Sequence, residues 1–262
     1  MKLLFKSLFR KIGLDIRKYP RSKYEYLLNY KRYDQKTVEL LGLPFKIADV
    51  TSFYYSHREI FIDRIYEFKS NKKEPKIIDC GSNYGTSIVF FKNLFPNSHI
   101  VGIEPDPKIF KILQHNIELR NFKNVSLINK AISSKKESVK FFSEGADGGR
   151  MHKIDSLNHH QIEALPLDDL IDDEVDFLKM DIEGAETDVL SNSNKINFVK
   201  EIFIEYHSFV DDRQKLDILL KFLKDNGFRF YIQTIFCSPR PLILTKSQLG
   251  MDLQLNIFAK RC

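Results

Sequence analysis

A glycine-rich segment that begins at residue 77, IIDCGSNYG, has residue types and a spacing that suit the binding of a cofactor. Asp79, Gly81, Asn83 and Gly85 form a D-x-G-x-N-x-G pattern between two apolar runs. Glycine tolerates positive φ and lets a ligand approach the backbone, and the free N–H groups of a following helix face the same space. The dinucleotide pattern G-x-G-x-x-G is absent, and an acid precedes the first glycine. The segment therefore favours S-adenosylmethionine, which carries a sulfonium and an ammonium group, with a tight structural turn as the alternative.

A second acid follows the next apolar run along the chain. The run IVGIEPD contains Glu104, which comes 25 residues after Asp79. An acid at the end of a second strand can accept hydrogen bonds from both ribose hydroxyls of a cofactor. A solvent-facing acid at a strand end is the alternative reading of Glu104 alone. The two features together favour a cofactor that contains adenosine.

Two later segments supply acids and a histidine. Asp181 and Glu183 follow the apolar run VDFLKM, whereas Glu205 and His207 end the run IFIEYH. Side chains two residues apart on a strand point to the same side, so Glu205 and His207 should face one space. Such a cluster suits general base catalysis or the binding of a substrate hydroxyl. A structural role remains the alternative for His207 considered by itself.

Within this cluster, His207 is the first candidate for the general base because its unperturbed pKa lies near neutrality. Asp181 or Glu205 could orient His207 or replace it. The same three side chains could also hold a divalent cation, since oxygen ligands suit magnesium. The spacing does not fix such a geometry, and we do not expect a metal.

The elements that must position these residues alternate between strands and helices from residue 71 onward. Such alternation predicts an α/β fold with a mostly parallel sheet and helices on both faces. The last two strands lack a helix between them, which predicts an antiparallel pair. The strands are expected at residues 76–79, 99–106, 125–133, 138–143, 175–184, 201–207, 228–236 and 253–261, and the helices at 86–95, 107–121, 185–193 and 213–227.

The first part of the chain follows a different pattern. Residues 1–70 are predicted to form a helical N-terminal extension or cap, with the cofactor-binding domain at residues 71–262. Residues 1–13 fit a basic amphipathic helix that could lie on an anionic membrane surface, with packing on the domain itself as the alternative. Residues 14–70 and the loop 237–252 are expected to cover the site of the methyl acceptor.

The composition sets broad limits on the class of protein. The chain of 262 residues has a net charge of +6, which fits nucleic acid, an anionic membrane or a solvated surface. Its 3 cysteines are odd in number and far apart, which argues against a disulfide framework. No apolar run is long enough to span a bilayer, and the basic N-terminus does not resemble a signal peptide. We expect a cytoplasmic protein that could contact the inner face of the membrane.

The combined motifs resemble those of the FkbM family of S-adenosylmethionine-dependent methyltransferases. The segments that carry the resemblance are IIDCGSNYG, VGIEPDP, NKAISSKKESVKFF, LPLDDLI, VDFLKMDIEGAETDVL and IFIEYH. They span residues 76 to 207, about half of the chain. The resemblance implies a class I methyltransferase fold, which is Rossmann-like with a sheet of seven strands and an antiparallel last strand.

The resemblance also implies roles for individual residues. The methionine part of the cofactor would contact Asp79, Gly81, Asn83 and Gly85, and the ribose would contact Glu104. The adenine would lie beside Ala131 and Ile132, and the methyl-transfer centre beside Asp181. Glu183, Glu205 and His207 match later motifs of the family. Arg150 stands where a small polar residue is more typical, which leaves the substrate contacts there open.

Family members typically methylate hydroxyl groups, so the resemblance implies O-methylation of a sugar in a glycan or glycolipid precursor, as in polysaccharide biosynthesis. A methyltransferase acting on RNA is one alternative, suggested by the positive charge. No D/N-P-P-Y/F motif is present to stack on a base, so we expect no nucleic-acid partner. A non-catalytic cofactor-binding scaffold in polysaccharide assembly is the other alternative.

Overall fold

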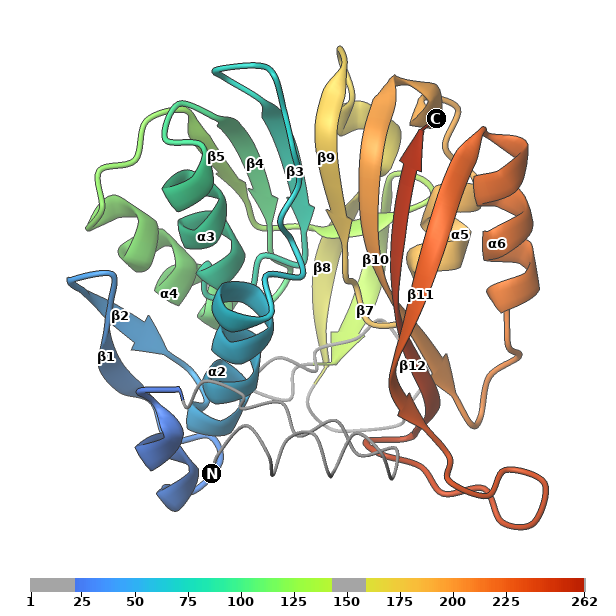
Figure 1. Cartoon of the computed structure of the whole chain (residues 1–262), viewed down its shortest axis with the longest axis horizontal. Coiled ribbons are helices and arrows are strands. Elements are labelled where there is room, and N and C mark those ends of the chain that lie inside the picture. Colours follow the sequence, from blue (N-terminus) through green and yellow to red (C-terminus); the bar gives the residue numbers. More distant parts are fainter. Residues whose placement is uncertain (1–21, 143–158, 262) are drawn as a thin grey trace, which may run out of the picture.

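The computed structural model describes residues 22–142 and 159–261, and its centre is a sheet of seven strands (Figure 1). The strand order is β11-β12-β10-β9-β3-β4-β5. Six strands run in the same direction, and β12 is antiparallel to both of its neighbours. The strands are β3 (Lys76–Cys80), β4 (His99–Ile103), β5 (Val125–Ile128), β9 (Val175–Met180), β10 (Val199–Phe209), β11 (Phe228–Cys237) and β12 (Met251–Arg261). This arrangement confirms the predicted fold class.

Helices cover both faces of the sheet, which explains why its central strands are almost continuously apolar. Ile77 and Phe177 belong to the core beneath α2, α3 and α4, whereas their neighbours Ile78 and Leu178 belong to the core beneath α5 and α6. The helices are α2 (Val50–His57), α3 (Thr86–Leu94), α4 (Pro107–Glu118), α5 (Glu186–Ser191) and α6 (Leu216–Asp225). Within the described ranges, no helix is long and apolar enough to cross a membrane.

The segment 125–133, predicted as one strand, forms two strands in different sheets. It divides into β5 and β6 (Ala131–Ser133), and β6 joins β7 (Glu137–Phe142) and β8 (His159–Pro166) in a sheet of order β6-β8-β7. The side-chain amide of Asn129 donates to the carbonyl oxygens of Glu104 at 2.8 Å and of Pro105 at 3.0 Å. These bonds hold the chain at the turn between the two strands. The prediction missed both the break and β8.

The described part of residues 1–70 is not wholly helical, which corrects the expectation for this segment. A hairpin of β1 (Lys36–Leu40) and β2 (Leu43–Ile47) precedes α2, and short helical turns flank them at Glu25–Asn29 and Arg58–Ile62. The hairpin turns at Leu41 and Gly42, both with positive φ. Alternate side chains of the hairpin, among them Val38 and Phe45, enter the same core as Ile77.

A buried asparagine joins this hairpin to the glycine-rich segment. The side chain of Asn116 on α4 donates to the carbonyl oxygens of Lys46 and Tyr84, both at 2.8 Å, and accepts from the N–H of Lys46 at 2.8 Å. Asn116 is fully buried, so these partners replace the water that it would otherwise bind. The hairpin is therefore fixed to the wall of the cavity described below.

Candidate active site

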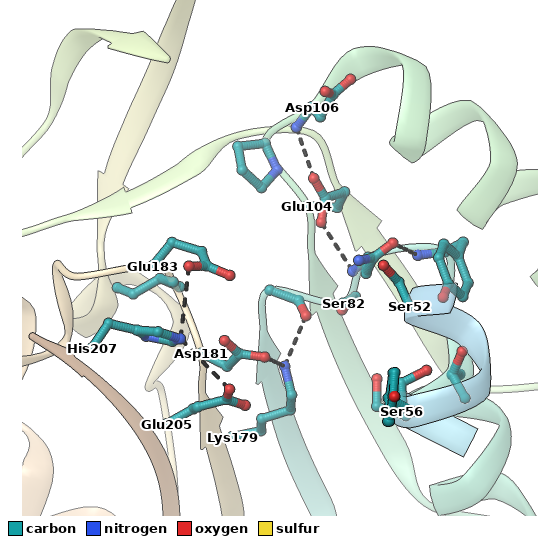
Figure 2. A pocket seen from close by; sticks show the side chains of 18 of the residues that line it. Ser52, Ser56, Ser82, Glu104, Asp106, Lys179, Asp181, Glu183, Glu205 and His207 are labelled. Atoms are coloured by element: carbon teal, nitrogen blue, oxygen red, sulfur yellow. Dashed lines mark hydrogen bonds and ion pairs between the residues drawn. The ribbon is translucent and has the colours of Figure 1, made fainter. Parts of the chain in front are cut away.

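A cavity of about 590 Å³ lies at the carboxyl ends of the parallel strands. This is where open α/β sheets usually bind their ligands. Figure 2 shows that Glu104 and Asp106 lie on one side of it, a cluster of charged side chains on another, and Ser52 and Ser56 of α2 opposite that cluster. The predicted site residues that line the cavity are Gly81, Asn83, Glu104, Ala131, Ile132, Asp181, Glu183, Glu205 and His207.

The glycine-rich segment forms the turn between β3 and α3, as predicted. Gly81 has a φ of 85°, Asn83 of 47° and Gly85 of 95°. A Cβ at Gly81 would lie 1.9 Å from the carbonyl oxygen of Asp181, and one at Gly85 would lie 2.8 Å from Leu113. Both positions therefore exclude side chains because of the protein itself. Of the predicted residues in this turn, Gly81 and Asn83 line the cavity, together with Ser82 and Tyr84, whereas Gly85 does not.

Glu104 is held at the edge of the cavity by two backbone groups. Its carboxylate accepts from the N–H of Asn83 at 2.9 Å and from the N–H of Asp106 at 2.8 Å. The side chain is mostly buried, and this burial raises the pKa of Glu104 to about 8. The two bonds fix the direction of a carboxylate that remains accessible from the cavity.

Asp79 does not line the cavity, so the structure offers no direct contact between it and a cofactor. Its buried carboxylate accepts from the hydroxyl of Ser87 at 2.5 Å and lies 3.5 Å from the ammonium group of Lys179. The prediction that Asp79 holds the methionine part stays a prediction, and in this structure the side chain lies behind the glycine-rich turn. The cause is the direction of strand β3, which points this side chain into the protein.

Lys179 is a cavity residue that the sequence analysis missed. Its ammonium group donates to the carbonyl oxygen of Gly81 at 2.8 Å and lies 3.1 Å from the carboxylate of Asp181. Burial alone would lower the pKa of Lys179, but Asp181, Tyr66 and Asp79 together raise it well above its usual value. Lys179 therefore stays charged and connects the glycine-rich turn to the acidic cluster. A lysine inside the apolar run VDFLKM was the signal in the sequence.

His207 lies among three glutamates. Its Nδ1 atom is 3.1 Å from Glu186, and its Nε2 atom is 3.7 Å from Glu183 and 3.5 Å from Glu205. Burial would lower the pKa of His207, but the carboxylates around the ring raise it well above the usual value. A raised pKa favours an imidazole that holds its proton at neutral pH, which makes the neighbouring Asp181 the better candidate for the base; the role of His207 stays a prediction.

Glu186 is the second site residue that the analysis did not select, although it is the last acid of the motif DIEGAE. It is buried and accepts from the backbone N–H groups of Ile182 at 3.2 Å and Gly184 at 3.0 Å. The same oxygen contacts Nδ1 of His207. Glu186 thus fixes both the turn after β9 and the orientation of the imidazole.

The remaining carboxylates differ in their affinity for protons. Burial raises the pKa of Asp181 to about 6 and that of Glu183 well above its usual value. Burial would also raise the pKa of Glu205, but its hydrogen bond with His207 leaves this pKa below the usual value. At neutral pH, Asp181 is therefore ionised and lies at the cavity with Lys179 beside it.

The set of Asp181, Glu205 and His207 could geometrically hold a metal ion. One potential ligand atom from each lies within 4.8 Å of the others. Two cationic groups already neutralise these acids, namely the ammonium group of Lys179 and the imidazolium of His207. A divalent cation would have to displace the proton of His207 and compete with Lys179.

Opposite this cluster, helix α2 presents hydroxyl groups to the cavity. Thr51, Ser52, Tyr55 and Ser56 line it from one face of the helix, and Glu59 lines it from the helical turn that follows. The helix begins at Asp49, whose side chain accepts from the N–H of Ser52 at 2.7 Å. The sequence analysis placed the acceptor site near residues 14–70 but selected none of these residues.

Two sequence predictions lie outside the described residues. These are the amphipathic helix at residues 1–13 and the loop that contains Arg150.

Comparison with known proteins points to one family. The model of the methyltransferase FkbM domain matches residues 79–230. Methyltransferase 1 of Beauveria bassiana is 28% identical over 162 residues, which cover 52% of this chain and 65% of the relative. Methyltransferase sdnD of Sordaria araneosa is 24% identical over 230 residues, which cover 69% of this chain and 87% of the relative.

A third relative, 2-O-methyltransferase NoeI of Sinorhizobium fredii, is 26% identical over 158 residues, or 52% of this chain and 64% of the relative. The chain thus spans just under two thirds of the length of the first and third of these proteins. Among solved structures, Trm5b from Pyrococcus abyssi has a TM-score of 0.50 at 13% identity and covers 86% of this chain and 55% of that one. This likeness supports the fold alone.

Proposed function

This chain belongs to the FkbM family of methyltransferases, and we propose that it transfers the methyl group of S-adenosylmethionine to a hydroxyl oxygen of a sugar in a glycan or glycolipid precursor. The observation that carries the proposal is a single cavity with two different walls. One wall has the glycine-rich turn and Glu104, and the other has the hydroxyl-bearing face of α2. The acidic cluster lies between them, and the relative named as a 2-O-methyltransferase supports transfer to oxygen.

On the cofactor side, the proposed contacts follow the chemistry of each group. The carboxylate of Glu104 would accept hydrogen bonds from the two ribose hydroxyls. The backbone at Gly81 and Asn83 would lie along the methionine part, and Ala131 and Ile132 would pack against the adenine. Both of these apolar side chains are buried at the cavity wall, which suits packing against the flat adenine ring.

In the proposed reaction, the acceptor oxygen attacks the methyl carbon while the bond from that carbon to sulfur breaks. The products are a methyl ether and neutral S-adenosylhomocysteine. The reaction depends mainly on holding the oxygen in line with the bond that breaks. Asp181 would accept the hydroxyl proton because it is the cavity carboxylate that is ionised beside a fixed ammonium group. His207 would keep its proton and hold Glu183 and Glu205 in place.

The direct test uses cofactor that carries ¹³C in its methyl group, together with a panel of sugar acceptors. A new O-methyl signal in the NMR spectrum of the acceptor and release of S-adenosylhomocysteine are the expected results. Transfer to nitrogen or carbon would contradict O-methylation. Tight cofactor binding with no turnover on any hydroxyl acceptor would instead favour a scaffold role.

The proposed base predicts how the rate depends on pH. The pKa of Asp181 is raised to about 6 by burial first and by Glu205, whereas Lys179 and His207 oppose the shift. Because only the ionised form accepts a proton, kcat/KM should rise as the pH increases through about 6 and then level off. Initial rates at saturating cofactor from about pH 5 to pH 8 would show this. A profile that is flat or falls across this range would argue against Asp181 as the base.

Removal of divalent cations should leave the activity unchanged. Lys179 and protonated His207 already supply positive charge to the acids that could bind a metal. The check is to measure turnover after dialysis against EDTA and again after magnesium or manganese is added. A large loss that one of these ions restores would show that Asp181, Glu205 and His207 form a metal centre.

A further inference from the structure

The loop between β11 and β12 carries an apolar tip that nothing in the described part of the chain covers. Leu242 is 99% exposed, Ile243 72% and Leu244 59%. In Figure 1 this loop projects at the lower right, beyond the carboxyl ends of the strands. Large apolar side chains that are this exposed, and adjacent, often mark an interaction site.

Backbone and side-chain hydrogen bonds fold the loop into a defined turn. The N–H groups of Ile243 and Leu244 both donate to the carbonyl oxygen of Arg240 at 2.9 Å. At the base of the loop, the buried hydroxyl of Ser238 accepts from the N–H of Lys246 at 2.9 Å. The outward direction of the apolar side chains is therefore a property of the fold.

The apolar surface continues from this tip to the mouth of the cavity. Ile235 and Leu249, at the two ends of the loop, are 43% and 56% exposed and also line the cavity. Tyr231 and Ile232 on β11 are also exposed, one on each face of the strand. A molecule with an apolar tail could therefore lie along the loop while its polar head occupies the cavity.

The loop itself carries charge of one sign, and the acids Asp211 and Asp212 lie at its base. Arg240 and Lys246 are its charged residues, and it contains no acid. Arg240 and Lys246 are exposed and flank the apolar tip. An apolar tip with flanking cations is complementary to a bilayer that has anionic headgroups.

From these features we infer that the loop at residues 239–249 docks on an anionic lipid bilayer, with Leu242, Ile243 and Leu244 inserted and Arg240 and Lys246 against the headgroups. A second copy of the chain fits the tip less well, because a stable protein interface uses about 20–30 residues on each side. The docked loop would turn the cavity mouth toward the membrane surface. Combined with the proposed function, on which this last step rests, the acceptor would be a sugar attached to a lipid.

The chain contains no tryptophan, so a single substitution can report on the tip. We expect the emission of the Ile243→Trp protein to shift to the blue with vesicles of phosphatidylcholine and phosphatidylglycerol, and to be quenched when the acyl chains are brominated. The matched control is Ile218→Trp, at a position that is 43% exposed on α6. Its emission should not change. If the emission of the Ile243→Trp protein also stayed unchanged when vesicles were added, the proposal would be overturned.

Sedimentation with the same vesicles measures the contribution of each part of the loop. Ile243→Glu, and separately Arg240→Gln with Lys246→Gln, should each weaken binding by about tenfold. The controls are Ile218→Glu and the pair Lys73→Gln with Lys224→Gln, which change exposed residues elsewhere. A change of oligomeric state in Ile243→Glu without lipid would identify the tip as a contact between copies and overturn the proposal. Because no acceptor is needed, these measurements stand even if the proposed reaction is wrong.

Discussion

Replacing Asp181 with asparagine should lower kcat by about 10²–10⁴-fold while the affinity for S-adenosylmethionine changes little. Asparagine keeps an oxygen that can accept from Lys179, which lies 3.1 Å from the native carboxylate. It cannot accept the proton of the acceptor hydroxyl at neutral pH. The loss should therefore appear in the chemical step, measured as single-turnover transfer at saturating cofactor and acceptor.

Asp176→Asn is the matched control for this experiment. Asp176 lies on β9, the strand that Asp181 follows. It is likewise an ion-paired acid and is buried, but it contacts Lys72 and Lys200 away from the cavity. Its replacement should reduce stability and leave kcat near the wild-type value. If Asp181→Asn were as active as Asp176→Asn, the proton acceptor would have to be another group, and Glu205, whose pKa is lowered, would be examined next.

Replacing Glu104 with alanine should weaken S-adenosylmethionine binding by about 10²-fold or more. The estimate applies above the raised pKa of about 8, where Glu104 is ionised, and assumes two hydrogen bonds from ribose hydroxyls to its carboxylate, each contributing about 1.5–3 kcal/mol. The native carboxylate is held in direction by the N–H groups of Asn83 and Asp106, an arrangement that alanine cannot reproduce. Calorimetric titration with S-adenosylmethionine and with methionine alone would measure the effect.

The comparison between these two ligands separates the proposed ribose contact from general damage. Methionine lacks the ribose, so it should bind more weakly than S-adenosylmethionine. Its affinity for the Glu104→Ala protein should equal its affinity for the wild type. Glu118→Ala, which changes an exposed acid on α4, should bind both ligands normally. Equal losses for both ligands would show that residue 104 maintains the shape of the turn and would contradict a ribose-specific role.

The parts of the fold that could be predicted from sequence are those with local and periodic signals. The apolar runs of β3 and β9 and the amphipathic pattern of α6 predicted a mostly parallel sheet, and the structure confirms it. The hairpin at residues 36–47 was missed because its apolar face is short and is stabilised by distant contacts, including Asn116. The break at Asn129 depends on carbonyl groups of the neighbouring strand end, which no local pattern reveals.

In the candidate site, too, local sequence patterns predicted some features, whereas others depend on contacts between distant residues. The strand-end acids and His207 could be selected because the carboxyl ends of parallel strands meet at one edge. Their protonation could not be predicted, since the pKa of His207 depends on glutamates from the turn after β9, from α5 and from β10. The direction of Asp79 into the protein and the position of Lys179 likewise became clear only from the packing of neighbouring strands.

The close approach of Gly81 to the carbonyl oxygen of Asp181 has a consequence for redesigning this protein. The turn proposed to bind the cofactor and the strand end that carries the proposed base cannot be altered independently, because a side chain at residue 81 would push them apart. The α2 face is less constrained, since its serine and tyrosine side chains meet the cavity from another element. Libraries that aim at new acceptors should therefore vary residues 51–59 and 248–251 while keeping residues 79–85 and 179–186 unchanged. Such a design would change which acceptor is bound and would leave the proposed cofactor-binding part of the site as it is.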